Sequence, residues 1–295
     1  MDEKIEQMKQ QYMDIPIPAE LDFIVNRAIQ LHKKKSKRSM KWVAAAAAAV
    51  VILVAGLNTS PALAQSLSEV PYVGKIMKVL TFRAYTFDDG AHIAKIEVPI
   101  ITNIDNKTLE ESLNTKYLEE SKELYASFMT DMEKMKASGK EGHLGVDSGY
   151  VVKTDNDLIL AVGRYVVNTV GSSSTTFQYD TIDKKNQLLI TLPSLFRDES
   201  YVQTISQNIK EQMLQRMKDD PSKVYWVEGA PIDAKMAIFK TIKKDQSFYI
   251  NAQNKLVIVF QKYEVTPGYM GVVEFVIPTN LISEQLSTHA YLSPE

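Results

Sequence analysis

Cysteine is absent from the 295 residues of this chain. Its absence excludes a disulfide framework, a thiolate-bound zinc ion and a cysteine nucleophile. The four histidines lie far apart, and none stands at the HExxH spacing of a zinc hydrolase. The sequence also contains no P-loop, no GxGxxG after a predicted strand and no GxSxG elbow. We therefore expect no cofactor, no metal site and no enzymatic activity.

Two short stretches do carry groups that could serve chemistry. In "TFDDG" (86–90), two carboxylates precede a glycine and could bind calcium, although a turn is the simpler interpretation. "HLGVDSG" (143–149) places a histidine, an aspartate and a serine together. Catalytic triads are assembled from distant segments, so we interpret this stretch as a loop. Because the sequence shows no cluster of histidines or acidic residues, an enzyme that modifies peptidoglycan is the alternative function that we favour least.

Charge is distributed unevenly along the chain. Residues 1–41 carry nine basic and six acidic side chains, whereas residues 42–64 carry no charge. Residues 65–295 carry 25 basic and 30 acidic side chains. A mildly acidic C-terminal part argues against a nucleic-acid partner and suits a cationic one.

The uncharged stretch predicts a membrane helix. "WVAAAAAAVVILVAGL" continues into "NTSPALA", which together give 23 residues (42–64), near the roughly 20 needed to cross a bilayer. "KKKSKRSMK" places six positive charges directly before it, which orients the N-terminus to the cytoplasm. A buried helix of a soluble protein is the alternative. We predict a single-pass protein of the cell membrane with an extracellular C-terminal domain.

The end of this span resembles a signal-peptidase site. Ala62 and Ala64 form the small-x-small pattern, Pro61 precedes them, and the cut would fall before Gln65. A secretory signal normally begins only a few residues before its apolar run, but here 41 residues come first. The pattern therefore favours a delayed, regulated cut over the removal of a leader.

Within residues 1–41, apolar side chains spaced by three or four predict two short amphipathic helices, one on either side of "IPIP" (15–18). Such a fragment is too small to bury its own apolar face, so we expect it to fold against a partner protein. A soluble tail without a partner is the alternative. The apolar positions that would make this contact are Ile15, Leu21, Ile24, Val25 and Ile29.

Residues 65–295 predict an α+β domain in which an antiparallel sheet packs against helices. Apolar spacing predicts a helix over 108–137 and another within 193–214. Alternating patterns predict a strand at 94–104, several strands over 149–192 with a turn at "GSSS", a hairpin at 247–265 and a strand at 272–278. The expected boundary between an N-terminal part and a C-terminal module lies near residue 180.

Several long stretches resemble the RsiV-type anti-sigma factors, which regulate an extracytoplasmic-function sigma factor of the sigma-V kind. They are "IPIPAELDFIVNRAI", "AKIEVPIITNIDNKTLEESLN", "LLITLPSLFRDESYVQTISQNI" and "SFYINAQNKLVIVFQKYEVTPGYMGVVEFVIP". The resemblance covers nearly the whole chain. It implies that residues 1–41 sequester the sigma factor and that residues 65–295 bind chicken-type lysozyme. Lysozyme binding would expose the site after Ala64 to signal peptidase, and an intramembrane protease would then release the sigma factor.

The resemblance also implies which residues contact lysozyme. Pro267, Gly268 and Tyr269 lie in "TPGYMG", which matches one contacting loop of the family. Ser172, Ser173 and Ser174 lie in "GSSS", where relatives have a Gly-Ala-His-like turn. Plain hairpin connections are the alternative interpretation of both loops. For the whole chain, the alternative is a secreted or anchored lysozyme inhibitor or cell-wall-binding module without signalling.

Overall fold

The structure is a computed structural model that describes residues 77–139, 142–231 and 237–293. Its larger sheet contains six strands in sequence order, and its smaller sheet contains three. The larger sheet consists of β1 (Lys78–Asp88), β2 (His92–Thr102), β3 (Leu144–Asp155), β4 (Ile159–Val170), β5 (Ser172–Asp183) and β6 (Leu188–Ile190). The smaller one consists of β7 (Phe248–Ile250), β8 (Leu256–Phe260) and β9 (Val273–Ile277). The α+β class predicted from the sequence is therefore confirmed.

The prediction of an antiparallel sheet is wrong at one strand pair. β2 and β3 run parallel, with His92 opposite Leu144, while all other neighbouring strands are antiparallel. Helix α5 (Lys107–Ala137) separates the two strands in sequence. A helical crossover returns the chain to the end where the previous strand began, so the next strand runs parallel to it. The larger sheet is mixed.

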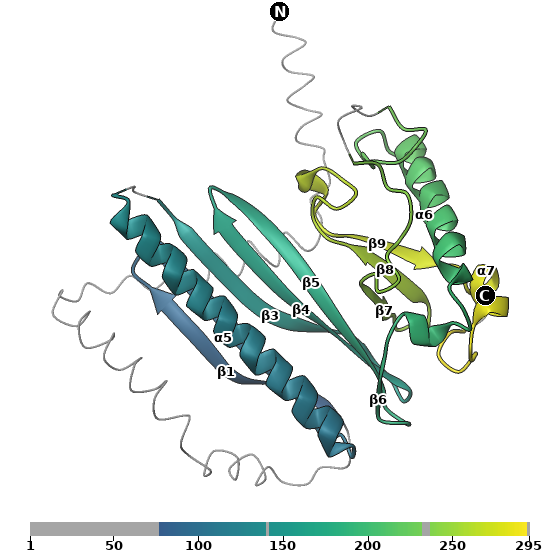
Figure 1. The fold of residues 1–295 in the computed structure, drawn as a ribbon, viewed down its shortest axis with the longest axis horizontal. Helices are drawn as coiled ribbons and strands as arrows, with labels where there is room; N and C mark the ends of the chain where they lie inside the picture. Colours follow the sequence, from purple (N-terminus) through teal and green to yellow (C-terminus); the bar gives the residue numbers. More distant parts are fainter. Residues whose placement is uncertain (1–76, 140–141, 232–236, 294–295) are drawn as a thin grey trace, which may run out of the picture. The chain divides into compact units, whose positions relative to one another are not determined.

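Helix α5 crosses one face of the larger sheet and packs against β2 (Figure 1). It begins where the Asn106 side chain accepts a hydrogen bond from the Leu109 amide at 3.2 Å, a standard N-cap. Its predicted apolar stripe is buried at Leu113, Tyr117, Phe128 and Met132. These side chains join two clusters with strand residues such as Ile101 and Ile96, so they are core residues.

The smaller sheet packs against helix α6 (Ser200–Asp219). In α6, the apolar residues that recur at every fourth position are all buried, namely Tyr201, Ile205, Ile209 and Met213. Short helical turns complete this half: η1 (Pro193–Leu195), η2 (Gly268–Met270), α7 (Thr279–Ile282) and η3 (Ser283–Gln285). None of the helices that the structure describes is long and apolar enough to cross a membrane.

Glu274 on β9 joins the two sheets. Its carboxylate accepts hydrogen bonds from Lys153 of β3 at 3.0 Å, Tyr249 of β7 at 2.8 Å and Tyr179 of β5 at 3.4 Å. Burial, together with the nearby Glu274 charge, raises the pKa of both tyrosine hydroxyls. The tyrosines therefore stay neutral donors, and the smaller sheet is tied to the face of β3 and β5.

Replacing Glu274 with alanine is expected to destabilise the domain by about 2–3 kcal/mol. The substitution leaves the Lys153 ammonium and two tyrosine hydroxyls without their acceptor. Urea unfolding of residues 65–295 measures the loss. Glu284→Ala is the matched control, because Glu284 is exposed on η3. Equal stability of the two variants would contradict this role of Glu274.

Candidate functional site

The first predicted loop is the tip of the β4–β5 hairpin. The chain reverses at Gly171, whose φ of +70° suits glycine. The three serines 172–174 are exposed but lie on β5, where Ser172 pairs with Val170 and Ser174 with Asn168. The sequence predicts a turn over Gly171–Ser174, but in the structure Gly171 alone supplies the left-handed backbone of the turn, and all three serines belong to β5.

The second predicted loop connects β8 to β9 and contains η2. Pro267 stands at the N-terminal end of η2, and Gly271 ends it with a φ of +65°. Tyr269 is 69% exposed, yet its hydroxyl donates to the Ser222 carbonyl at 2.8 Å. One end of this ring is therefore fixed while its face stays open to solvent.

The structure joins these two loops, which lie about 90 residues apart in sequence. The side-chain amide of Gln261 accepts from the Phe177 backbone N–H at 2.8 Å and donates to the Phe177 carbonyl at 2.7 Å. Lys262 donates to the Ser173 carbonyl. Gln261 thus pairs with the edge of β5 as another strand would, and the β8–β9 loop is held beside the hairpin (Figure 1).

The joined loops carry the most exposed large apolar side chains among the described residues. These are Tyr269 at 69%, Val170 at 56% and Tyr263 at 54% exposure. Exposed aromatic side chains on a fixed loop are typical of protein-contact surfaces. The arrangement can bind a partner protein.

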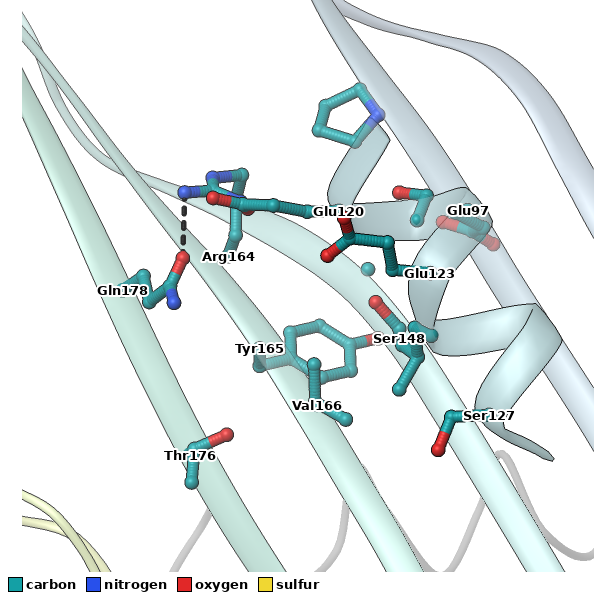
Figure 2. Close-up of a pocket in the computed structure, with 14 residues that line it drawn as sticks. Glu97, Glu120, Glu123, Ser127, Ser148, Arg164, Tyr165, Val166, Thr176 and Gln178 are labelled. Carbon is teal, nitrogen blue, oxygen red and sulfur yellow. Dashed lines mark hydrogen bonds and ion pairs between the residues drawn. The ribbon is translucent and has the colours of Figure 1, made fainter. Parts of the chain in front are cut away.

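A cavity of about 350 Å³ lies elsewhere, between α5 and the larger sheet (Figure 2). Its lining includes Glu97, Glu123 and Arg164. Arg164 forms an ion pair with Glu120 and donates to Gln178 at 2.8 Å, so its charge is paired within the fold. None of the predicted lysozyme-contacting residues lines this cavity.

The "TFDDG" stretch forms a turn, as the simpler interpretation held. Gly90 has a φ of +91° and donates to the Asp88 carboxylate. Asp89 accepts hydrogen bonds from His92 at 3.0 Å and pairs with Lys136 at 2.8 Å. Burial alone would raise the pKa of Asp89, but the hydrogen bonds from Lys136 and His92 lower it well below its usual range. His92 and Lys136 thus balance the charge of the Asp89 carboxylate, and no calcium ion is needed for this.

The prediction of a loop at "HLGVDSG" is wrong. β3 begins at Leu144, so Asp147 and Ser148 are successive residues of a strand. Successive side chains of a strand point to opposite faces of the sheet. Pairing with β2 on one side and with β4 on the other imposes this extended conformation on a glycine-containing stretch that looked irregular in isolation.

Other predicted positions lie outside the described residues. They comprise the partner-binding positions Ile15, Leu21, Ile24, Val25 and Ile29, the span 42–64, and the cleavage-site residues Ala62, Ala64 and Gln65. Conversely, sequence reasoning did not single out Gln261, Lys262 or Tyr263. Their only signal was a place in "FQKYEVTPGYMG", directly before the predicted contacting loop.

Two family models match parts of the chain. A protein family of unknown function, DUF3298, matches residues 193–280, and a domain of unknown function, DUF4179, matches residues 34–134. A solved DUF3298 family structure from Bacteroides fragilis covers 72% of this chain and 94% of its own, with a TM-score of 0.50 at 16% identity. This likeness supports the fold alone.

A curated relative extends over the whole length. The anti-sigma-V factor RsiV of Bacillus subtilis is 45% identical over 293 residues, which are 99% of this chain and 100% of the relative. Identity at this level over both full lengths confirms the resemblance seen in the sequence. The chain therefore belongs to the RsiV family of anti-sigma-V factors.

Proposed function

We propose that this anti-sigma factor is a single-pass membrane protein that senses lysozyme through the joined loops of its outer domain. Residues 1–41 would lie in the cytoplasm, residues 42–64 would span the membrane and residues 65–295 would lie outside. The cell would use the protein to switch on lysozyme resistance when its envelope is attacked.

One observation above all supports the sensing surface. Gln261 and Lys262 bring the loop with Pro267, Gly268 and Tyr269 beside the hairpin that carries Ser172–Ser174. These are the two loops that the family resemblance assigns to lysozyme. A fixed pair of loops binds with a smaller loss of conformational entropy than two independent loops would.

Calorimetry of residues 65–295 with chicken-type lysozyme tests the sensing half of the proposal. The fragment contains Val73–Glu295, which forms one compact unit with its own buried cores. We expect saturable one-to-one binding at micromolar concentrations or below. An absence of heat and of complex formation at these concentrations would contradict the proposal.

The anti-sigma function follows from membership of the RsiV family, and the partner in this function is an extracytoplasmic-function sigma factor of the sigma-V kind. An anti-sigma factor is a regulator, which agrees with the expectation that this chain is not an enzyme. We infer that Ile15, Leu21, Ile24, Val25 and Ile29 form the apolar face that the sigma factor covers.

Changing Ile24 to aspartate is expected to abolish co-purification of residues 1–41 with the sigma factor. A buried, unpaired carboxylate in the interface costs several kcal/mol. Gln30→Asp, which makes a similar change outside the predicted apolar face, is the matched control. Undiminished co-purification of Ile24→Asp would place the contact elsewhere.

Release of the sigma factor would start with a cut between Ala64 and Gln65 by signal peptidase, followed by an intramembrane protease. Lysozyme can favour the cut only if it binds the cleavable arrangement more tightly than the protected one. Deleting residues 2–31 distinguishes this account from an inhibitor or cell-wall module without signalling. The deletion makes sigma-dependent transcription constitutive in a signalling protein and leaves it unchanged in the alternative.

A further inference from the structure

We propose that Tyr263 is a positioning residue for the lysozyme-binding loop: its ring supports the backbone of Gly268 and thereby fixes Tyr269. This inference rests on the proposed function and adds a residue that the predicted contact set does not contain.

The backbone of Tyr263 is strained. Its φ is +68°, and it is the third residue of a turn in which the Glu264 amide donates to the Gln261 carbonyl at 3.0 Å. Glycine or asparagine usually fills such a position, because a Cβ is unfavourable in the left-handed region. A tyrosine here needs a compensating contact.

That contact is Gly268. A Cβ built on Gly268 would lie 2.2–2.3 Å from the Cζ, Cε1 and Oη atoms of the Tyr263 ring. Non-bonded carbon atoms pack at about 3.5–4.0 Å, so only glycine leaves room for the ring at this distance. The ring of Tyr263 therefore rests directly on the backbone that begins η2.

Tyr269 directly follows Gly268, so fixing the backbone of Gly268 also fixes the position of Tyr269, the proposed contact residue. The Tyr269 hydroxyl also donates a hydrogen bond to the Ser222 carbonyl at 2.8 Å. The turn that carries Tyr263 is itself fixed to β5 through Gln261. Tyr263 is 54% exposed, so its side chain is not part of the hydrophobic core. Tyr263 thus connects the fixed strand edge to the loop that presents Tyr269.

Calorimetry with lysozyme on residues 65–295 tests the inference with four variants. Tyr263→Asn keeps a residue that tolerates the turn but removes the ring, and we expect about tenfold weaker binding. Tyr263→Phe keeps the ring and is expected to bind within about twofold of the wild type. The double variant Tyr263→Asn, Tyr269→Ala is expected to bind no more weakly than Tyr269→Ala alone, because Tyr263 acts through Tyr269.

Nuclear magnetic resonance of the same variants supplies a readout that does not depend on lysozyme. The Tyr263 ring should shift the Gly268 α-protons upfield, and this shift should vanish in Tyr263→Asn and persist in Tyr263→Phe. If the wild type fails to bind lysozyme, the proposed function fails, and these shifts still decide the positioning role.

With the variants still folded, any of three results would overturn the inference. They are unchanged Gly268 resonances in Tyr263→Asn, unchanged affinity of that variant for lysozyme, or additive losses in the double variant. Additive losses would make Tyr263 an independent lysozyme contact instead. Loss of binding in Tyr263→Asn together with a collapsed thermal transition would make its role one of general stability.

Discussion

Replacing Tyr269 with alanine is expected to weaken lysozyme binding by about 30-fold or more, which corresponds to about 2 kcal/mol. Tyr269 is the most exposed of the large apolar side chains that the structure describes, and its hydroxyl is already fixed by Ser222. A ring held in place before binding loses little conformational entropy on contact, so most of its buried area contributes to affinity.

Calorimetry with residues 65–295 measures the change, and Leu281→Ala is the matched control. Leu281 is 48% exposed on α7, which follows β9, whereas the Tyr269 loop precedes that strand. The control should retain the wild-type affinity. Equal affinities of Tyr269→Ala and wild type would show that lysozyme binds away from the joined loops.

Replacing Ala64 with phenylalanine is expected to abolish the lysozyme-induced cut and the transcription that depends on it. Signal peptidase accepts only small residues at the two positions that Ala62 and Ala64 occupy in this pattern. A phenylalanine ring does not fit there, so the full-length protein should persist and the sigma factor should stay bound. Immunoblotting of cells treated with lysozyme measures the first effect, and a sigma-dependent reporter measures the second.

Leu63→Phe is the matched control for this experiment. It introduces the same ring one residue earlier, at the position between the two small residues, and should leave cleavage intact. Cleavage of Ala64→Phe at the wild-type rate would place the cut elsewhere and contradict the assignment of the site.

The long helices could be predicted from the sequence because their apolar spacing is regular. The helix predicted over 108–137 is α5 at Lys107–Ala137, and the residues spaced by four in α6 are all buried. β1 was not predicted. A register shift between Thr81 and Arg83 interrupts its period of two, and this edge strand shows partly exposed residues on both faces. An edge strand with a bulge gives little local signal.

The parallel pairing of β2 and β3 could not be predicted from local patterns either. It depends on where the chain lies after α5 and not on the composition of the two strands. The same limit applies to "HLGVDSG", which becomes a strand only because β2 and β4 pair with it.

The candidate site was predictable as two separate loops but not as one surface. The family resemblance named Tyr269 and the three serines, while the attachment of the β8–β9 loop to the hairpin depends on two side chains of that loop. Gln261 pairs with Phe177, and Lys262 reaches Ser173. No spacing rule indicates that a glutamine side chain will complete the edge of a distant strand. Tyr263 was missed for the same reason, since its contact with Gly268 exists only in the folded loop.

N-terminal sequencing of the fragment released when lysozyme is added to intact cells tests the central claim most directly. The account predicts a fragment that begins at Gln65 and appears only after lysozyme is added. A fragment with another first residue, or one released equally without lysozyme, would contradict it.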